Sequence, residues 1–198
     1  MKKIKVFIDV YYYKAALSGI KTYIKELKHA VDLHGSKRVE YVFSHELSDL
    51  SNNQTYLNSK NQIIRWIFQL NYLVWKQLIL PFKLFWHRPD YLICPDYILP
   101  MINFKTKKFS VIHDSLFWDY PENYSLLWRK YYIKLIDLGI DKKTKIITTS
   151  NYSKKNLQKI FKKNCEIDYI YQSFEKPSTN EINSNFSINI PKSYILHV

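Results

Sequence analysis

The sequence predicts a doubly wound α/β fold with a mostly parallel sheet. Short apolar runs, which are typical of buried strands, alternate with segments in which apolar residues recur at helical spacing. The alternation continues along almost the whole chain and gives repeated strand–helix–strand units, the usual connection between parallel strands. Hydrophobic residues make up 46% of the 198 residues, so the chain is globular rather than disordered. Together these observations indicate a Rossmann-like domain.

The first part of the chain contains two expected strands, Ile4 to Ile8 and Val39 to Phe43. The helix between them opens at Gly19 and ends near Gly35. Its apolar face consists of residues at helical spacing, namely Ile20, Tyr23, Ile24, Leu27 and Val31. Residues 44–60 are polar and show no periodicity, so we expect a long loop there that carries at most a short strand.

The segment from Ile63 to Trp86 is the most hydrophobic part of the chain. A membrane span needs about 20 mostly uncharged residues. Here Arg65, Lys76 and Lys83 interrupt the segment, and Pro81 is expected to break it. We therefore expect a core helix whose outer edge of Trp and Lys can contact a membrane surface, with a membrane span as the weaker alternative.

The second part of the chain continues the alternation. Strands are expected at Tyr91 to Cys94, Phe109 to Ile112, Lys145 to Thr149 and Ile167 to Tyr171, with a basic turn at Lys105 to Lys108. Helices are expected at Tyr124 to Asp141 and Lys154 to Phe161. The apolar face of the first of these helices is expected to comprise Leu127, Tyr131, Leu135 and Leu138.

The last part of the chain changes in composition. Residues 177–193 are rich in Ser and Asn and predict a linker, which limits the domain to residues 1–176. Residues 194–198 have the pattern of a new buried strand. We therefore expect this strand to be the first of a second domain that continues beyond Val198.

The charge and the cysteines restrict the classes of partner. Thirty Lys and Arg against 17 Asp and Glu give a net charge of +13, which attracts nucleic acid, acidic lipid or phosphorylated small molecules. A solvated Lys-rich surface explains the charge equally well. The lysines are spread along the chain and no nucleic-acid-binding module is visible, so no nucleic acid is expected as a partner. Cys94 and Cys165 form neither a disulfide framework nor a metal-binding spacing, which indicates a reducing, cytoplasmic compartment.

Polar residues at the carboxyl ends of strands are the candidate site residues, because open α/β sheets bind ligands at that edge. His113 and Asp114 directly follow the strand that ends at Ile112. A histidine there can exchange a hydrogen bond with a sugar hydroxyl, and the adjacent carboxylate can orient neighbours or bind a second hydroxyl. The alternative is a buried histidine that only completes the strand.

Three further positions have both a functional and a structural interpretation. Ser18 and Gly19 at the start of the first helix would let backbone N–H groups approach a phosphate, although a lone glycine also suits a tight turn. Ser150 is either an N-cap worth about 1 kcal/mol or part of an anion site. Asp9 is either a loop-organising carboxylate or a site residue. The sequence contains no HExxH, DxD or Cys/His cluster, so no metal is expected.

Four stretches of the chain, taken in order, resemble one family. Ser18 to Leu27 is similar to a G-I-x-x-Y-x-x-E-L helix, and Trp75 to Pro100 to the helix and strand before a cleft. Val111 to Asp114 is similar to a strand that ends in H-D, and Ile146 to Lys154 to an I-x-x-S-x-x-S strand and helix. This ordered set resembles the N-terminal half of the GT-B fold in retaining glycosyltransferases of glycosyltransferase family 4, and residues 194–198 resemble the first strand of their second domain.

The resemblance implies an enzyme that transfers a sugar from a nucleotide-sugar to a glycan or lipid-linked acceptor with retention, in bacterial surface polysaccharide synthesis. It implies no metal or other cofactor, because basic side chains and helix termini neutralise the leaving diphosphate. His113 would face the donor sugar and, with Asp114, form the catalytic pair. Gly19 would face the donor phosphate or the acceptor, Asp114 and Ser150 would line the cleft, and Ser18 and Asp9 complete the expected binding set. The enzyme would be cytoplasmic, with a peripheral contact to the inner face of an anionic membrane as a further expectation.

The sequence also departs from the family pattern. Ser18 precedes Gly19 where the family often has a second glycine, Asn151 stands where a glutamate commonly follows the serine, and no glycine follows Tyr171. These departures leave the details of the donor loop open. Because the residues up to Val198 would form only one wall of the cleft, we expect little transfer by this chain alone. The alternative from another class is a non-catalytic α/β binding module that pairs with a separate catalytic protein.

Overall fold

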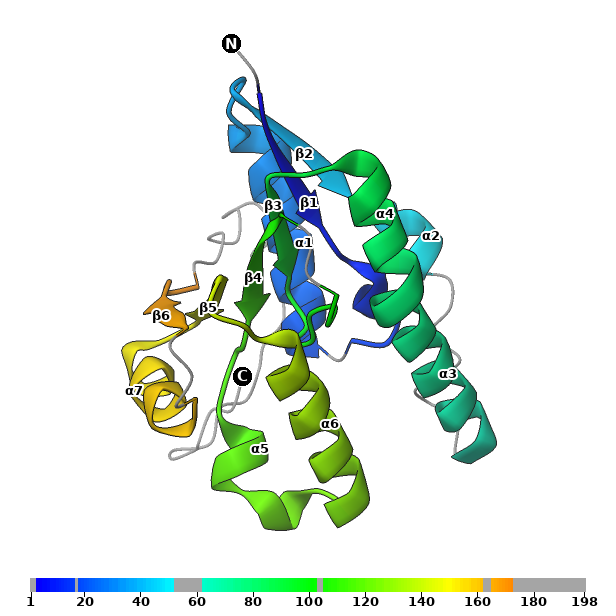
Figure 1. The fold of residues 1–198 in the computed structure, drawn as a ribbon, viewed down its shortest axis with the longest axis vertical. Coiled ribbons are helices and arrows are strands. Elements are labelled where there is room, and N and C mark those ends of the chain that lie inside the picture. The colour runs from blue at the N-terminus through cyan, green and yellow to red at the C-terminus, as the bar shows by residue number, and fades with distance from the viewer. Residues whose placement is uncertain (1–2, 17, 52–61, 103–104, 162–164, 173–198) are drawn as a thin grey trace, which may run out of the picture.

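A computed structural model describes residues 3–16, 18–51, 62–102, 105–161 and 165–172. The described strands form one sheet in the order β2-β1-β3-β4-β5-β6, and every neighbouring pair is parallel (Figure 1). The strands are β1 (Ile4–Ile8), β2 (Val39–Phe43), β3 (Tyr91–Cys94), β4 (Lys107–Val111), β5 (Thr144–Thr148) and β6 (Glu166–Tyr169). After β1 the chain runs outward to β2 and then returns to β3 on the other side of β1. The carboxyl ends of β1 and β3 therefore form a topological switch point.

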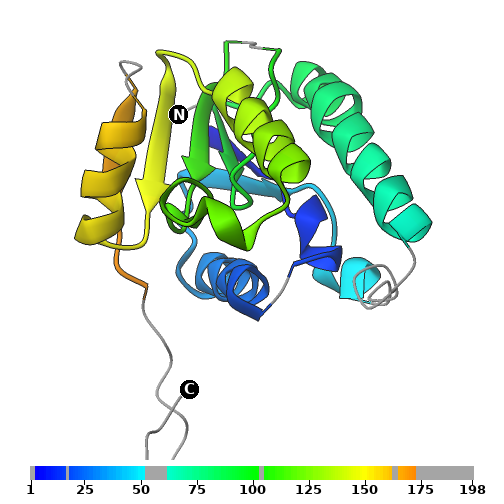
Figure 2. The same ribbon diagram turned by 90° about the horizontal axis from the view of Figure 1, so that it is seen from below.

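Helices cover both faces of the sheet, which confirms the doubly wound, Rossmann-like fold. The helices are α1 (Ser18–His34), α2 (Leu47–Ser51), α3 (Gln62–Val74), α4 (Leu80–His87), α5 (Leu116–Asp119), α6 (Leu126–Gly139) and α7 (Asn151–Ile160). Figure 2 shows α1 and α2 on one side of the sheet, with α3, α4 and α6 on the other. Each face of the sheet has its own hydrophobic core, because successive side chains of a strand point to opposite sides. Val6 and Ile8 pack with Ile24 of α1, whereas Phe7 lies in the larger core with Leu80 and Ile136.

Strand β4 begins earlier than the sequence predicted. Lys107 and Lys108 were expected in a basic turn, but both belong to the strand. The side chain of Lys108 is buried, its Nζ donates to the carbonyl of Gly139 at 2.8 Å, and it pairs with Asp141 Oδ2 at 2.9 Å. A buried ammonium is tolerated when it is paired and hydrogen-bonded, so the strand can continue through a lysine.

Two other expectations were wrong in detail. Residues 47–51 form helix α2 within the segment expected to be a loop, and residues 52–61 lie outside the described part of the chain. In α6 the expected apolar face is mostly exposed, and Leu127 is 83% accessible. The buried residues of this helix are Tyr132, Leu135, Ile136 and Gly139. The close approach of Gly139 sets this orientation, because a Cβ there would stand 2.7 Å from the carbonyl oxygen of Leu99. The expected linker at 177–193 and the strand at 194–198 also lie outside the described residues.

Helices α3 and α4 are joined by a π-helical turn, Trp75–Ile79, so the chain is helical from Gln62 to His87. Pro81 was expected to break this segment, but it lies within the first turn of α4. The Leu80 N–H donates to the Trp75 carbonyl five residues back, and this wider turn accommodates the proline ring. Among the described residues, no helix is long and apolar enough to cross a membrane.

Candidate functional site

His113 lies just beyond the carboxyl end of β4 and contacts residues of the three other stretches that resemble the family. Its ring meets Tyr23 of α1 edge-on, with 4.9 Å between the ring centroids. Its Nε2 lies 3.0 Å from the carbonyl oxygen of Pro95, which follows β3. Its own carbonyl accepts a hydrogen bond from Thr149 Oγ1 at 2.9 Å, just after β5. Side chains separated by up to 126 positions in the sequence therefore converge on one histidine at the carboxyl edge of the sheet.

Burial sets the protonation state of His113, and the hydrogen bond to Pro95 sets its tautomer. Burial lowers the pKa of the imidazole, and the hydrogen bond to Pro95 and the nearby Asp114 only partly oppose that effect. The ring is therefore neutral at pH 7. A carbonyl oxygen can only accept, so Nε2 carries the proton and Nδ1 keeps its lone pair. Nδ1 is thus an acceptor suited to a hydroxyl donor.

Asp114 and Tyr97 flank this histidine. The carboxylate of Asp114 is half-buried, and its Oδ1 accepts a hydrogen bond from the Leu116 N–H at 3.1 Å. Burial, and after it the charge of Asp114, raises the pKa of Tyr97 well above the usual range of a tyrosine. The backbone of Tyr97 has a φ of 70°, in the left-handed region, which costs on the order of 1 kcal/mol or more. Strained backbone of this kind is held in place by surrounding structure, and here it places the tyrosine ring 5.7 Å from that of His113.

Ser150 and Gly19, which lie at the starts of two helices, have different structural roles. Ser150 is the N-cap of α7, and its Oγ accepts a hydrogen bond from the Ser153 N–H at 3.1 Å, so the capping interpretation is confirmed. Gly19 lies in the first turn of α1, and a Cβ built there would meet no described atom within 4 Å. Packing therefore does not require a glycine at this position. The side chain of Ser18 lies outside the described part of the structure.

Asp9 belongs to a buried ionic cluster at the switch point. Its side chain is completely enclosed, and Lys76 Nζ lies 2.6 Å from its Oδ2. Its Oδ1 accepts hydrogen bonds from Trp75 Nε1 at 3.0 Å, Ser44 Oγ at 3.1 Å and the Tyr11 N–H at 3.2 Å. Asp9 thus organises the loop after β1, and its carboxylate does not reach an open surface. The role of Asp9 in ligand binding stays a prediction that this geometry does not favour.

The second carboxylate of the cluster belongs to Asp96, two residues after β3. Lys76 Nζ lies 2.7 Å from Asp96 Oδ1, and the Tyr72 hydroxyl donates to Asp96 Oδ2 at 2.8 Å. Burial raises the pKa of Asp96 to about 6, with a contribution from the charge of Asp9 and against the attraction of Lys76. Burial alone would lower the pKa of Lys76, but the two carboxylates outweigh it and hold that pKa above its usual range. Lys76 is therefore a permanent cation between two acids.

This arrangement bears on whether the cluster could hold a metal ion. Asp9, Cys94 and Asp96 offer ligand atoms that lie within 4.8 Å of one another. The ammonium of Lys76 already stands between the two carboxylates and supplies the positive charge. Burial raises the pKa of the Cys94 thiol well above its usual range, so the thiol is protonated beside Lys76. These donors fit an internal ion pair better than a metal.

Lys76 and Asp96 were not among the residues predicted for the site. The Trp and Lys residues of the segment were expected on an outer edge, which is wrong for Trp75 and Lys76, because both are buried. A signal was nevertheless present, because Lys76 falls in a series at four-residue intervals whose other members are apolar or aromatic: Phe68, Tyr72, Leu80 and Leu84. A lysine on the inner stripe of a helix needs a buried carboxylate, and the acids that follow β1 and β3 were the available partners.

Comparisons of this chain with models of known families, with curated proteins and with solved structures find no match.

Proposed function

We propose that this chain is the acceptor-side half of a glycosyltransferase that moves a sugar from a nucleotide-sugar to a glycan or lipid-linked acceptor with retention. The observation that supports the proposal most is the convergence at His113. Tyr23, Pro95 and Thr149 belong to three stretches that resemble the family, and each contacts the histidine of the fourth. All four stretches lie at the carboxyl edge of the sheet, which is the edge where open α/β proteins bind ligands.

In this proposal the neutral His113 recognises the donor sugar. Its Nδ1 lone pair accepts a hydrogen bond from a sugar hydroxyl, while the Nε2–H bond to Pro95 holds the ring in place. Asp114 lies beside it, where its carboxylate accepts from the Leu116 N–H and interacts with the Tyr97 side chain, and its remaining acceptor capacity suits a second sugar hydroxyl. The backbone of Gly19 is open to an approaching phosphate or acceptor. The diphosphate would be neutralised by the second half of the cleft, as in the family that the chain resembles.

The test measures sugar transfer from a panel of nucleotide-sugars by the protein as its gene encodes it. We expect His113→Ala to lower kcat by about 100-fold, because a positioned polar group at the reacting sugar is lost. His34→Ala is the matched control, since His34 is exposed in the last turn of α1. Urea unfolding of both variants separates a loss of activity from a loss of folding.

Unchanged kinetics of His113→Ala would assign His113 a structural role. If that protein turns over no nucleotide-sugar, the proposal fails and a non-catalytic α/β binding module is the better description. Binding of the same nucleotide-sugars, followed by protein fluorescence, distinguishes a binding module for such ligands from a protein that does not recognise them.

A further inference from the structure

The described exposed side chains of the helical segment from Gln62 to His87, called the α3–α4 helix, are mostly apolar. Among the described side chains from Ile63 to Trp86, every exposed one except Asn71 is apolar. Ten side chains form this surface, which we call the α3–α4 face: Ile63, Trp66, Ile67, Leu70, Val74, Leu78, Ile79, Phe82, Phe85 and Trp86. Monomeric soluble proteins rarely expose continuous apolar surface on this scale, so an occupant is expected.

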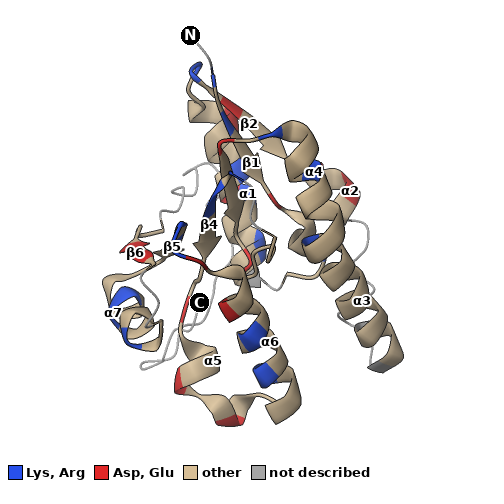
Figure 3. Cartoon of the chain, in the orientation of Figure 1, with Lys and Arg blue, Asp and Glu red and all other residues tan. Residues whose placement is uncertain are grey.

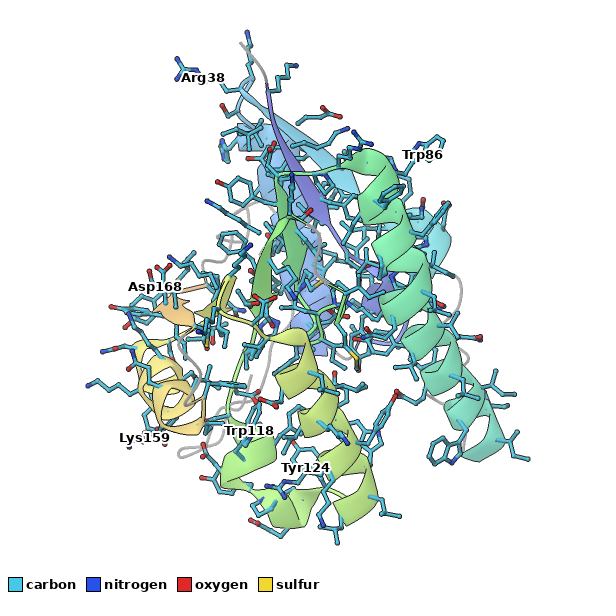
Figure 4. The ribbon with its side chains drawn as sticks, in the orientation of Figure 1. Arg38, Trp86, Trp118, Tyr124, Lys159 and Asp168 are labelled. Atoms are coloured by element: carbon cyan, nitrogen blue, oxygen red, sulfur yellow. The ribbon has the colours of Figure 1, made fainter. Side chains whose placement is uncertain are left out.

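The form of the α3–α4 face suits a lipid surface. A helix of this length extends about 40 Å at 1.5 Å per residue, and its exposed side chains recur at intervals of three and four positions. Two tryptophans, Trp66 and Trp86, lie near its ends, and Figure 4 shows Trp86 projecting away from the body of the protein. Amphipathic helices that lie in a bilayer interface combine such an apolar side with tryptophan and flanking cations.

Cations adjoin the α3–α4 face at the end of α4. A groove of about 590 Å³ there is lined by Phe85 of the face and by Arg88, Lys105 and Lys107. It contains one carboxylate, Asp90, whose Oδ2 accepts a hydrogen bond from the Lys5 N–H at 2.8 Å. The sequence from residue 62 to 88 contains no Asp or Glu, and Figure 3 shows how few charged positions lie along α3. The charge beside the apolar surface is therefore positive, which complements anionic lipid headgroups.

We propose that the α3–α4 face docks on an anionic phospholipid bilayer, with its aromatic side chains in the interface and the Arg88–Lys105–Lys107 groove against lipid phosphates. The helix lies on the bilayer and does not cross it, because its opposite side holds Lys76 in the protein core. This docking is independent of the proposed sugar transfer and would hold for a binding module as well.

The experiment is flotation of the protein with vesicles of phosphatidylcholine, with and without phosphatidylglycerol. The triple variant Trp66→Ser, Phe82→Ser, Trp86→Ser is expected to lower partitioning to both vesicle types at least about tenfold, since three exposed aromatic side chains no longer enter the interface. The control triple Leu33→Ser, Tyr152→Ser, Ile170→Ser removes side chains of similar exposure elsewhere and is expected to bind within twofold of the wild type, roughly as surface changes do.

A second variant tests the charge. Arg88→Gln, Lys105→Gln, Lys107→Gln is expected to weaken binding to anionic vesicles by about fivefold per charge and to leave binding to neutral vesicles unchanged. Quenching of wild-type tryptophan fluorescence by brominated lipid gives a reading that does not depend on any variant. Equal binding by the aromatic triple and the wild type, or absence of quenching, would overturn the proposal. So would a wild-type dimer that ignores vesicles and becomes monomeric in the aromatic triple, because the face would then bind a second copy.

Discussion

Helix α1 and the α3–α4 helix cover opposite faces of the same sheet but arrange their side chains in opposite ways. In α1 the inner side is apolar, with Ile24 fully buried, and the outer side carries residues such as Lys25 and Glu26. In α3–α4 a lysine, Lys76, is 0% exposed, whereas Trp86 on the outer side is 75% exposed. The first helix follows the usual amphipathic rule, with apolar residues inside and charged residues outside. The second helix reverses that rule in part, because it buries a lysine and exposes aromatic residues.

The comparison shows that the partners of a side chain decide its position as much as its hydropathy does. Lys76 can be buried because β1 and β3 end at the switch point and deliver Asp9 and Asp96 to it. On the outer side, large aromatic side chains such as Trp86 are exposed, which favours an apolar environment there. We attribute that environment to a bilayer.

The largest effect is expected from removing the buried cation. Lys76→Met leaves Asp9 and Asp96 facing each other in the core without a positive charge, and the free energy of unfolding should fall by about 3–5 kcal/mol. Lys83→Met is the matched control on the same helix, where the half-buried ammonium lies 5.5 Å from the Trp75 ring, and its cost should be under about 1 kcal/mol. Urea unfolding measures both. Equal losses would show that the cluster contributes no special stability.

The pH dependence of the free energy of unfolding should reveal the raised pKa of Asp96. Its pKa is raised from the ordinary 3.8 to about 6, chiefly by burial, so the folded state holds this proton more tightly than the unfolded state does. Its contribution to the free energy of unfolding is therefore complete below pH 3.8 and is lost as the pH rises through about 6. Relative to Asp96→Asn, the wild type should lose stability across that window in urea unfolding at a series of pH values. A gain across the same window would mean that Lys76 lowers the pKa of Asp96.

The smallest effects separate two tryptophans of one helix. Trp75→Phe removes the indole N–H that donates to Asp9 Oδ1, and a hydrogen bond to a charged group is worth about 1.5–3 kcal/mol. Trp86→Phe changes an exposed side chain and should alter stability by less than about 0.5 kcal/mol. Thermal unfolding of both variants makes the comparison. If the two losses are similar, the hydrogen bond inside and the exposed ring outside are not energetically distinct.

Much of the fold could be predicted from the sequence, because local residue patterns determine the strands and the helix caps. The strands β1, β2 and β3 have the expected bounds, since each is a short apolar run bordered by a polar residue or a turn. The N-cap at Ser150 was likewise readable from local residues. The face of α6 was not, because two apolar stripes compete on that helix and the contact of Gly139 with Leu99 selects one of them.

The candidate site shows the same division. That His113 stands at a carboxyl edge followed from the order of strand and loop. That it is neutral, bonded to Pro95 and packed against Tyr23 depends on segments that only the fold brings together.

The sequence by itself determined an α/β sheet, the approximate positions of its strands, the placement of polar residues at one edge and the positive charge of the molecule. Only the tertiary structure decided that Lys76 faces inward and that the aromatic residues of the same helix face outward. The physical reason is that a helix of mostly apolar residues has no unique inner side. Two buried carboxylates, supplied by strands far away in the sequence, fix that side by the energy of neutralising them.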